Sequence, residues 1–270
     1  MHPRHLAHHA LKLLNAGTPG VLVSALSGQC LDVGAWDLPP PGQTAFRRAG
    51  GGAPMFAGDG VISVVMVIPR TVAPERILNQ CCRPLLAWLK SRKIPASYGG
   101  RDALSVPDGQ PVRFALTGTE AAFLVEARVA HSAGLDPLGW PAPVAVKPGD
   151  RRPSRTLVGL SRSVAPAVDD VVAELREVLQ PLGPRLPDAY VAESDDVVGE
   201  APGAVVKAPI GDVWARKDGT VVGPFHASVG LVERIRTLTL SERVREALAE
   251  PGAFVWGADA EHLAAALESA

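Results

Sequence analysis

Apolar residues recur along this chain at the three- to four-residue spacing of amphipathic helices in several places. The clearest pattern starts at Pro74, where apolar side chains return every four residues, and Pro84 inside it is expected to kink the helix. The same spacing predicts helices over residues 6–14 and 168–179. Two further helical patterns close the sequence, and Asp259 stands where the cap of the last one is expected. The residues that carry the first pattern are Ile77, Leu78, Cys81, Cys82, Leu85, Leu86 and Leu89.

Other apolar stretches are short and rich in β-branched residues, which is typical of strands. Residues 61–68 form an almost continuous apolar run between a glycine and a proline, and this pattern predicts a buried strand. Shorter strands are predicted over residues 21–26, 104–106 and 112–116, the last two on either side of the turn PDGQ. A hairpin is predicted around the Asp218-Gly219 pair, because Asp-Gly favours tight hairpin turns.

These elements predict an α+β protein with two domains joined by a linker. Residues 121–130 fit either a strand or a helix. We expect a large domain over residues 1–185, with mixed or antiparallel sheets and packed helices, and a small α+β domain over residues 203–270. Residues 186–202 are rich in proline, aspartate and glutamate without sustained periodicity, and are predicted to form the linker.

The charge balance and the cysteines limit the classes of function. The chain has 27 basic and 28 acidic residues, which argues against binding to nucleic acid or to an acidic membrane surface. Its three cysteines, Cys30, Cys81 and Cys82, are an odd number and include an adjacent pair, so a disulfide framework is not expected. No signal peptide is recognised, and the longest apolar run is too short to cross a bilayer. The sequence therefore predicts a cytoplasmic protein.

The stretch RRAGGG combines two arginines with three consecutive glycines, Gly50, Gly51 and Gly52, just before a predicted strand. A phosphate-binding P-loop and a dinucleotide fingerprint both need their glycines to enter a helix, so neither fits. Glycines without a Cβ let the main chain approach a ligand and leave N–H groups free for phosphate or carboxylate oxygens. Arg47 and Arg48 would add guanidinium donors. The alternative is a glycine-rich hairpin with solvated arginines.

Several segments in order resemble the lipoate–protein ligase A family, which has the biotin/lipoate protein ligase fold. The most specific is RRAGGGAPMF, followed by GDGVISVVMVIP, which is similar to the double arginine and triple glycine of that family. The opening HPRHLAHHALKLL, the segment ASYGGRDALSVPDGQ and the stretch TLVGLSRSVAPAVDDVVAELREVL are similar to other parts of the family's catalytic domain. The end of the chain from about Gly203 resembles the family's accessory domain.

This resemblance implies an acyl ligase that uses ATP and Mg²⁺. Lipoate or octanoate would attack the α-phosphate of ATP, and a lysine of a lipoyl-domain acceptor protein would then take the acyl group from the adenylate. The family's pocket maps onto residues expected to bind the acyl group or the adenylate here: Arg47, Arg48, Gly50, Gly51, Gly52, Arg101 and Asp102. Residues 61–66 would help to wall an apolar slot for the acyl chain.

The sequence departs from the family where the catalytic lysine is expected. Pro111 occupies that position, and proline has neither an ammonium group nor a backbone N–H. Phe114 replaces the glycine that follows in the family motif, and the asparagine before Asp102 is also missing. Arg113 and Lys147 are possible substitutes for the missing positive charge.

Three hypotheses about function follow. The first is a lipoate- or octanoate–protein ligase, and the second is a catalytically inactive homologue, a pseudoenzyme that binds an acyl group, an adenylate or a lipoyl domain, or serves as a partner subunit. The third and weakest is a transferase with Cys30 as its nucleophile. No metal site is predicted, because His5, His8 and His9 are better explained as solvated residues on one helix face than as ligands of a transition metal.

Overall fold

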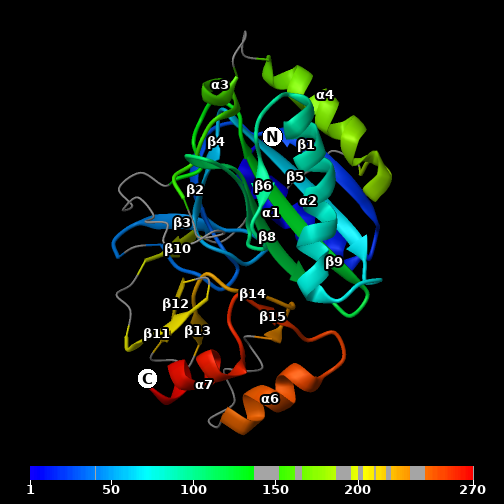
Figure 1. Ribbon diagram of the computed structural model, residues 1–270. Coiled ribbons are helices and arrows are strands. Elements are labelled where there is room, and N and C mark those ends of the chain that lie inside the picture. Colours follow the sequence, from blue (N-terminus) through cyan, green and yellow to red (C-terminus); the bar gives the residue numbers. More distant parts are fainter. Residues whose placement is uncertain are drawn as a thin grey trace.

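The computed structural model describes residues 1–39, 41–136, 152–161, 166–186, 196–199, 203–209, 211–216, 220–231 and 241–269. Its largest element is a six-stranded antiparallel sheet with the strand order β1-β5-β9-β8-β7-β6 (Figure 1). The strands of this sheet are β1 (Gly20–Ala25), β5 (Val61–Pro69), β9 (Ala122–Ala130), β8 (Gly109–Gly118), β7 (Ala103–Val106) and β6 (Ser97–Tyr98). Residues 121–130, which fitted either a strand or a helix, thus form strand β9.

A four-stranded sheet with the order β10-β3-β2-β4 lies beside the first. In it, β2 and β3 run parallel, whereas β10 and β4 pair antiparallel with their neighbours. Its strands are β2 (Gln29–Val33), β3 (Thr44–Arg47), β4 (Met55–Gly58) and β10 (Asp196–Val198). Strand β10 falls within the segment predicted to be a linker, so part of that segment is bound to this sheet.

Helices cover the six-stranded sheet from both sides. On one face lie α2 (Pro74–Ser91) and α4 (Val168–Leu179), whose apolar residues form a core with the even-numbered residues of β5 (Figure 1). On the other face, α1 (Pro3–Asn15) packs against Val61, Val65 and Val67 of β5. Two short helices, α3 (Leu157–Leu160) and the 3₁₀ helix η1 (Gln180–Leu182), complete this part of the chain. The helices predicted over residues 6–14, from Pro74 onward and over residues 168–179 are therefore present.

The described residues from 203 onward form a small α+β unit, here called the carboxy-terminal unit. Its strands are β11 (Val205–Ala208), β12 (Gly211–Ala215), β13 (Val221–Val222), β14 (His226–Ala227) and β15 (Val255–Trp256), and its helices are α6 (Ser241–Ala249) and α7 (Ala260–Glu268). The predicted cap of the last helix is present, because Oδ1 of Asp259 accepts the N–H of His262 at 3.0 Å. The predicted Asp218-Gly219 turn lies outside the described residues.

The two parts of the chain share a core. Trp36, from the loop after β2, is buried among apolar residues of the carboxy-terminal unit that include Val213 and Phe225. The fold confirms the α+β prediction. None of the helices in the described part of the chain combines the length and apolarity needed to cross a membrane.

Candidate functional site

The glycine run, residues 50–52, leaves β3 and enters the space between the two sheets and the carboxy-terminal unit. Each of its three N–H groups donates to an acceptor in a distant part of the chain. The bonds run from Gly50 to Oε2 of Glu126 at 2.7 Å, from Gly51 to the carbonyl oxygen of Leu116 at 3.0 Å, and from Gly52 to the carbonyl oxygen of Phe225 at 3.1 Å. The donors that the sequence assigned to a ligand are thus bonded within the protein.

Close main-chain approach explains why glycine is needed at these positions. A Cβ on Gly51 would lie 2.3 Å from the carbonyl oxygen of Phe225 and 2.7 Å from Cα of His226. Gly52 has a φ of +89°, which L-residues rarely adopt, and a Cβ there would lie 2.7 Å from Cε1 of His226. The absence of side chains in the run therefore makes room for the carboxy-terminal unit.

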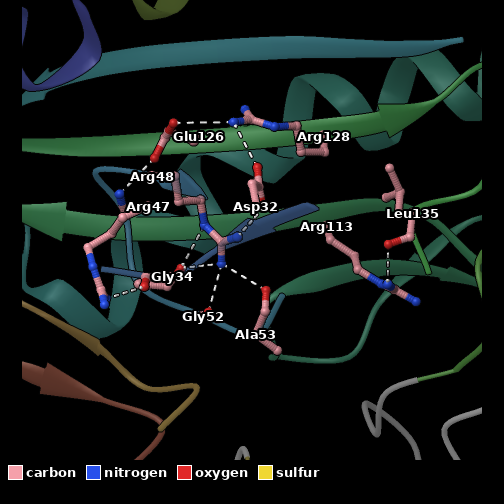
Figure 2. A network of polar contacts seen from close by, with 12 residues as sticks. Asp32, Gly34, Arg47, Arg48, Gly52, Ala53, Arg113, Glu126, Arg128 and Leu135 are labelled. Carbon is pink, nitrogen blue, oxygen red and sulfur yellow. Dashed lines mark hydrogen bonds and ion pairs between the residues drawn. The ribbon is translucent and has the colours of Figure 1, made fainter. Parts of the chain in front are cut away.

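Arg48 is the centre of a polar network with no exposed member (Figure 2). Its guanidinium pairs with Asp32, with 2.5 Å between Nη1 and Oδ1. Nη2 of Arg48 also donates to the carbonyl oxygens of Gly51, Gly52 and Ala53 at 2.7–2.8 Å. A guanidinium has five N–H donors, and this one directs them to Asp32 and to the loop that carries it.

Two further charged side chains, Glu126 and Arg128, join Arg48 and Asp32. We call these four residues the buried ion network. Arg128 donates to Oγ of Ser63 at 2.6 Å and lies 3.3 Å from Asp32 and 3.5 Å from Glu126. Nε of Arg128 has no hydrogen-bond partner among the described residues. The network holds two carboxylates and two guanidiniums, all at most 1% exposed, so its formal charges cancel. Cancellation of this kind is what allows charges to remain buried.

Arg47 points to the other side of the loop and fixes the turn that carries Trp36. Its Nη1 donates to the carbonyl oxygens of Gly34 and Ala35, at 3.0 and 2.5 Å, and to that of Asp37 at 3.1 Å. This turn supplies Trp36 to the core of the carboxy-terminal unit. In the described contacts, Arg47 therefore joins the two parts of the chain.

Asp102 reaches the glycine run through a residue that the sequence did not single out, His226. Nε2 of His226 lies 3.7 Å from Oδ2 of Asp102, and Nδ1 accepts the N–H of Leu116 at 3.1 Å. The His226 ring is fully buried and packs on Trp256, with 5.0 Å between the ring centroids. The neighbouring Arg101 donates to the carbonyl oxygen of Pro209 in the carboxy-terminal unit. Nothing in the local sequence around His226 marked it, because its partners come from distant segments.

Pro111, at the expected lysine position, and Arg113, its possible substitute, both lie on β8, and no described contact joins either of them to the glycine run. Pro111 is buried in the part of β8 where the pairing with β7 shifts register, as suits a residue without an N–H. Arg113 binds instead to the segment after β9: Nη2 donates to Oδ1 of Asp136 at 2.5 Å and to the carbonyl oxygen of Arg152 at 2.9 Å. In Figure 2 its guanidinium lies apart from Arg48, beside Leu135. Lys147 lies outside the described residues.

Among the described residues, the remaining nucleophilic and histidine side chains do not form a cluster. Sγ of Cys30 lies 3.7 Å from Nε2 of His2, and His131 has Nε2 2.9 Å from the carbonyl oxygen of Pro166. Within the described part of the chain, no group of three or more histidine, cysteine, aspartate or glutamate residues is placed to hold a metal ion.

The three thiols are expected to differ sharply in reactivity. Burial raises the pKa of Cys82 to about 11, and burial together with the charge of Cys82 raises the pKa of Cys81 further. At about pH 7.5, fewer than about one in a thousand Cys82 side chains would be thiolate. We therefore expect Ellman's reagent to modify only the half-buried Cys30 in the native protein, and all three thiols after unfolding in guanidinium. Rapid reaction of more than one thiol in the native protein would contradict this assignment.

Comparisons with known proteins place the fold. No protein-family model matches the sequence, and no curated protein sequence matches it. Solved structures do match. One is a bipartite lipoate protein ligase from Thermoplasma acidophilum, reported with its E2 lipoyl domain (TM-score 0.53, 12% identity, 68% of this chain and 83% of that chain). Another is lipoate-protein ligase A bound with ATP (TM-score 0.53, 10% identity, 70% and 84%). A third is protein Ta0514 from T. acidophilum with bound lipoic acid (TM-score 0.51, 12% identity, 70% and 85%). This chain has the fold of lipoate–protein ligases.

Proposed function

We propose that this chain is a non-adenylating protein of the lipoate-ligase fold, which acts by binding a lipoyl-type acceptor domain. The observation that carries the proposal is the bond from the Gly50 N–H to Glu126, because it places an internal carboxylate on a donor that a ligand's carboxylate or phosphate would need. The carboxylate of Glu126 thus occupies the position where the anionic head group of a ligand would bind.

The rest of the site supports the same conclusion. Arg48 is bonded to Asp32 and to three carbonyl oxygens, so a phosphate would have to replace these bonds to bind it. Residues 61–66, expected to wall an acyl slot, are buried on both faces of β5 and contribute to the two cores on either side of the sheet. In the arrangement described, Arg48 and the glycine run do not fit the phosphates of ATP, and residues 61–66 do not fit an acyl chain.

Of the two substitutes considered for the missing lysine, Lys147 lies outside the described residues and Arg113 makes its contacts elsewhere. Arg113 is nearest in sequence, and its guanidinium is bound to Asp136 and to the carbonyl oxygen of Arg152. Loss of one charged contact to a transition state commonly costs about 3 kcal/mol or more, which is a rate loss of more than a hundredfold.

A lipoyl-type domain is the partner that the fold favours. The T. acidophilum ligase with the same fold was described together with its E2 lipoyl domain. A ligase-fold protein that lost adenylation while keeping its two-part architecture would retain the surface that recognises such a domain. We propose that this surface is what the chain uses.

Adenylation and acceptor binding are tested separately. The purified protein is incubated with ATP, Mg²⁺ and either lipoate or octanoate, and AMP and acyl-AMP are measured by mass spectrometry beside an active lipoate–protein ligase. We expect no AMP above the protein-free blank. Stoichiometric acyl-AMP would make the chain a ligase and overturn the proposal.

In the second arm, an isolated lipoyl domain is titrated into the protein by calorimetry. We expect a dissociation constant in about the micromolar range, which corresponds to about 8 kcal/mol of binding free energy. A lipoyl domain with its acceptor lysine replaced by methionine should bind with the same affinity, because no acyl group is transferred to the lysine. Absence of binding by both domains would refute the partner that we propose.

Restoring the lysine alone is expected not to restore adenylation. Pro111 lies four residues before Ala115 on β8, and Cβ of Ala115 would be 2.8 Å from a Cβ on Gly50. Four strand residues span about 13 Å, which is more than a lysine side chain can bridge. We expect Pro111→Lys to give no more AMP than the parent protein in the assay above. Turnover by this variant would show that the pocket is otherwise competent.

A further inference from the structure

His226 lies where the carboxy-terminal unit covers the glycine run. Residues 225–229, here called the covering segment, lie alongside the end of β8. Besides the bond from Leu116 to His226, Oγ1 of Thr117 donates to the carbonyl oxygen of Ala227 at 2.8 Å, and the N–H of Val229 donates to the carbonyl oxygen of Gly118 at 2.8 Å. At its other end, the carbonyl oxygen of Phe225 accepts the N–H of Gly52. The covering segment is thus bonded to both β8 and the glycine run.

The bond from Leu116 fixes the protonation state of the His226 ring. Nδ1 accepts a backbone N–H, so it carries no proton in this arrangement. A proton added to Nδ1 would place one N–H against another and remove the only acceptor that the described contacts give to the buried N–H of Leu116. Protonation and the bonded arrangement therefore exclude each other at this atom.

The charged groups that face His226 do not replace the lost bond. Asp102 lies 3.7 Å from Nε2, on the far side of the ring from Nδ1, so its carboxylate favours a positive ring but offers Leu116 no acceptor. The Arg48 guanidinium and the His226 ring both lie beside Gly52, since a Cβ added to Gly52 would be close to each of them. The positive charge of Arg48 is paired with Asp32. The third neighbour, Trp256, is uncharged.

We propose that His226 makes the cover over the glycine run sensitive to pH. The ring can take up a proton only when the covering segment is released, so a fall in pH below about 6.5, where histidine in water becomes protonated, shifts the balance towards the released form by about tenfold per pH unit. Release frees the N–H groups of Leu116 and Gly52 and uncovers a strip of main chain. This inference concerns the covering segment alone and does not depend on the proposed function.

Hydrogen–deuterium exchange of the full chain tests the proposal. Exchange is measured at about pH 7.5 and about pH 5.5, and each rate is divided by the rate of an unstructured peptide at the same pH. We expect protection of the peptides that span residues 50–53 and 114–118 to fall by about tenfold or more at the lower pH, while protection of residues 62–68 in β5 stays within about twofold. Equal protection at both pH values, or an equal loss throughout the chain, would overturn the proposal.

The variant His226→Asn separates this histidine from other titrating groups. The asparagine side-chain oxygen can occupy the place of Nδ1 and accept the N–H of Leu116, but it does not titrate. We expect its protection over residues 114–118 to be the same at both pH values. His262→Asn, at a partly exposed helix cap, serves as the matched control and should keep the pH dependence of the parent. If His226→Asn does not fold, the comparison of segments within the parent protein still decides the question.

Discussion

Replacement of Glu126 by alanine is expected to destabilise the protein by about 3–5 kcal/mol, as is usual when one member of a buried ion pair is removed. The change leaves the N–H of Gly50 without its acceptor and leaves the buried ion network with two guanidiniums and a single carboxylate. Urea unfolding followed by circular dichroism measures the loss. Glu126→Gln keeps an oxygen for Gly50 but removes the charge, so its loss should be smaller, about 1–3 kcal/mol.

The same variant gives a direct test of the view that Glu126 stands where a ligand's head group would bind. In Glu126→Ala the vacated space adjoins the Gly50 N–H and Arg128, which are the partners of the lost carboxylate. We expect formate or acetate to raise the stability of Glu126→Ala, by about 1.4 kcal/mol at ten times the dissociation constant, and to leave the parent unchanged. Chloride at equal ionic strength is the control. If chloride stabilises the variant as much as formate, the space does not select a carboxylate.

Replacement of Gly51 by alanine is expected to cost about 3 kcal/mol and to separate the carboxy-terminal unit from the rest of the chain. The added Cβ would lie 2.3 Å from the carbonyl oxygen of Phe225 and 2.7 Å from Cα of His226. Both atoms belong to the main chain, so they cannot move aside as the end of a flexible side chain would. A fall in unfolding temperature, with loss of exchange protection over residues 225–229, is the expected result.

Gly134→Ala is the matched control for this substitution. Gly134 is exposed, and a Cβ there would meet only Ser154 at 3.6 Å, which is an ordinary contact. We expect its stability to stay within about 0.5 kcal/mol of the parent. If Gly51→Ala is equally harmless, the glycine run is not required for the approach of the covering segment.

The elements of the fold could be predicted from the sequence to a large extent, because each depends on a local pattern. The four-residue apolar spacing after Pro74 is α2, and the apolar run at residues 61–68 is β5. The run RRAGGG was recognised as unusual for a similar reason: three side-chain-free residues in a row have a physical meaning wherever they occur. Residues 121–130 stayed ambiguous, since a strand buried on both faces loses the alternation that would identify it.

The candidate site could be predicted only in part. The sequence brought Arg48, the glycine run and Asp102 into one hypothesis, and in the structure these residues lie around one point. It gave no indication of Glu126 or His226, which lie 76 and more than 170 residues further along the chain than the glycines they meet. Neither Glu126 nor His226 is part of a local sequence pattern from which a distant partner could be predicted.

What the sequence determined by itself was therefore the helices and strands that have a clear apolar pattern, and the presence of a main-chain strip beside two arginines. Only the tertiary structure decided what that strip binds. Pairing of β8 with β9 and docking of the carboxy-terminal unit bring acceptors to all three glycine N–H groups. Hydrogen-bond donors and charges buried between packed layers must find partners, and which partners they find depends on how the layers meet rather than on neighbouring residues in the chain.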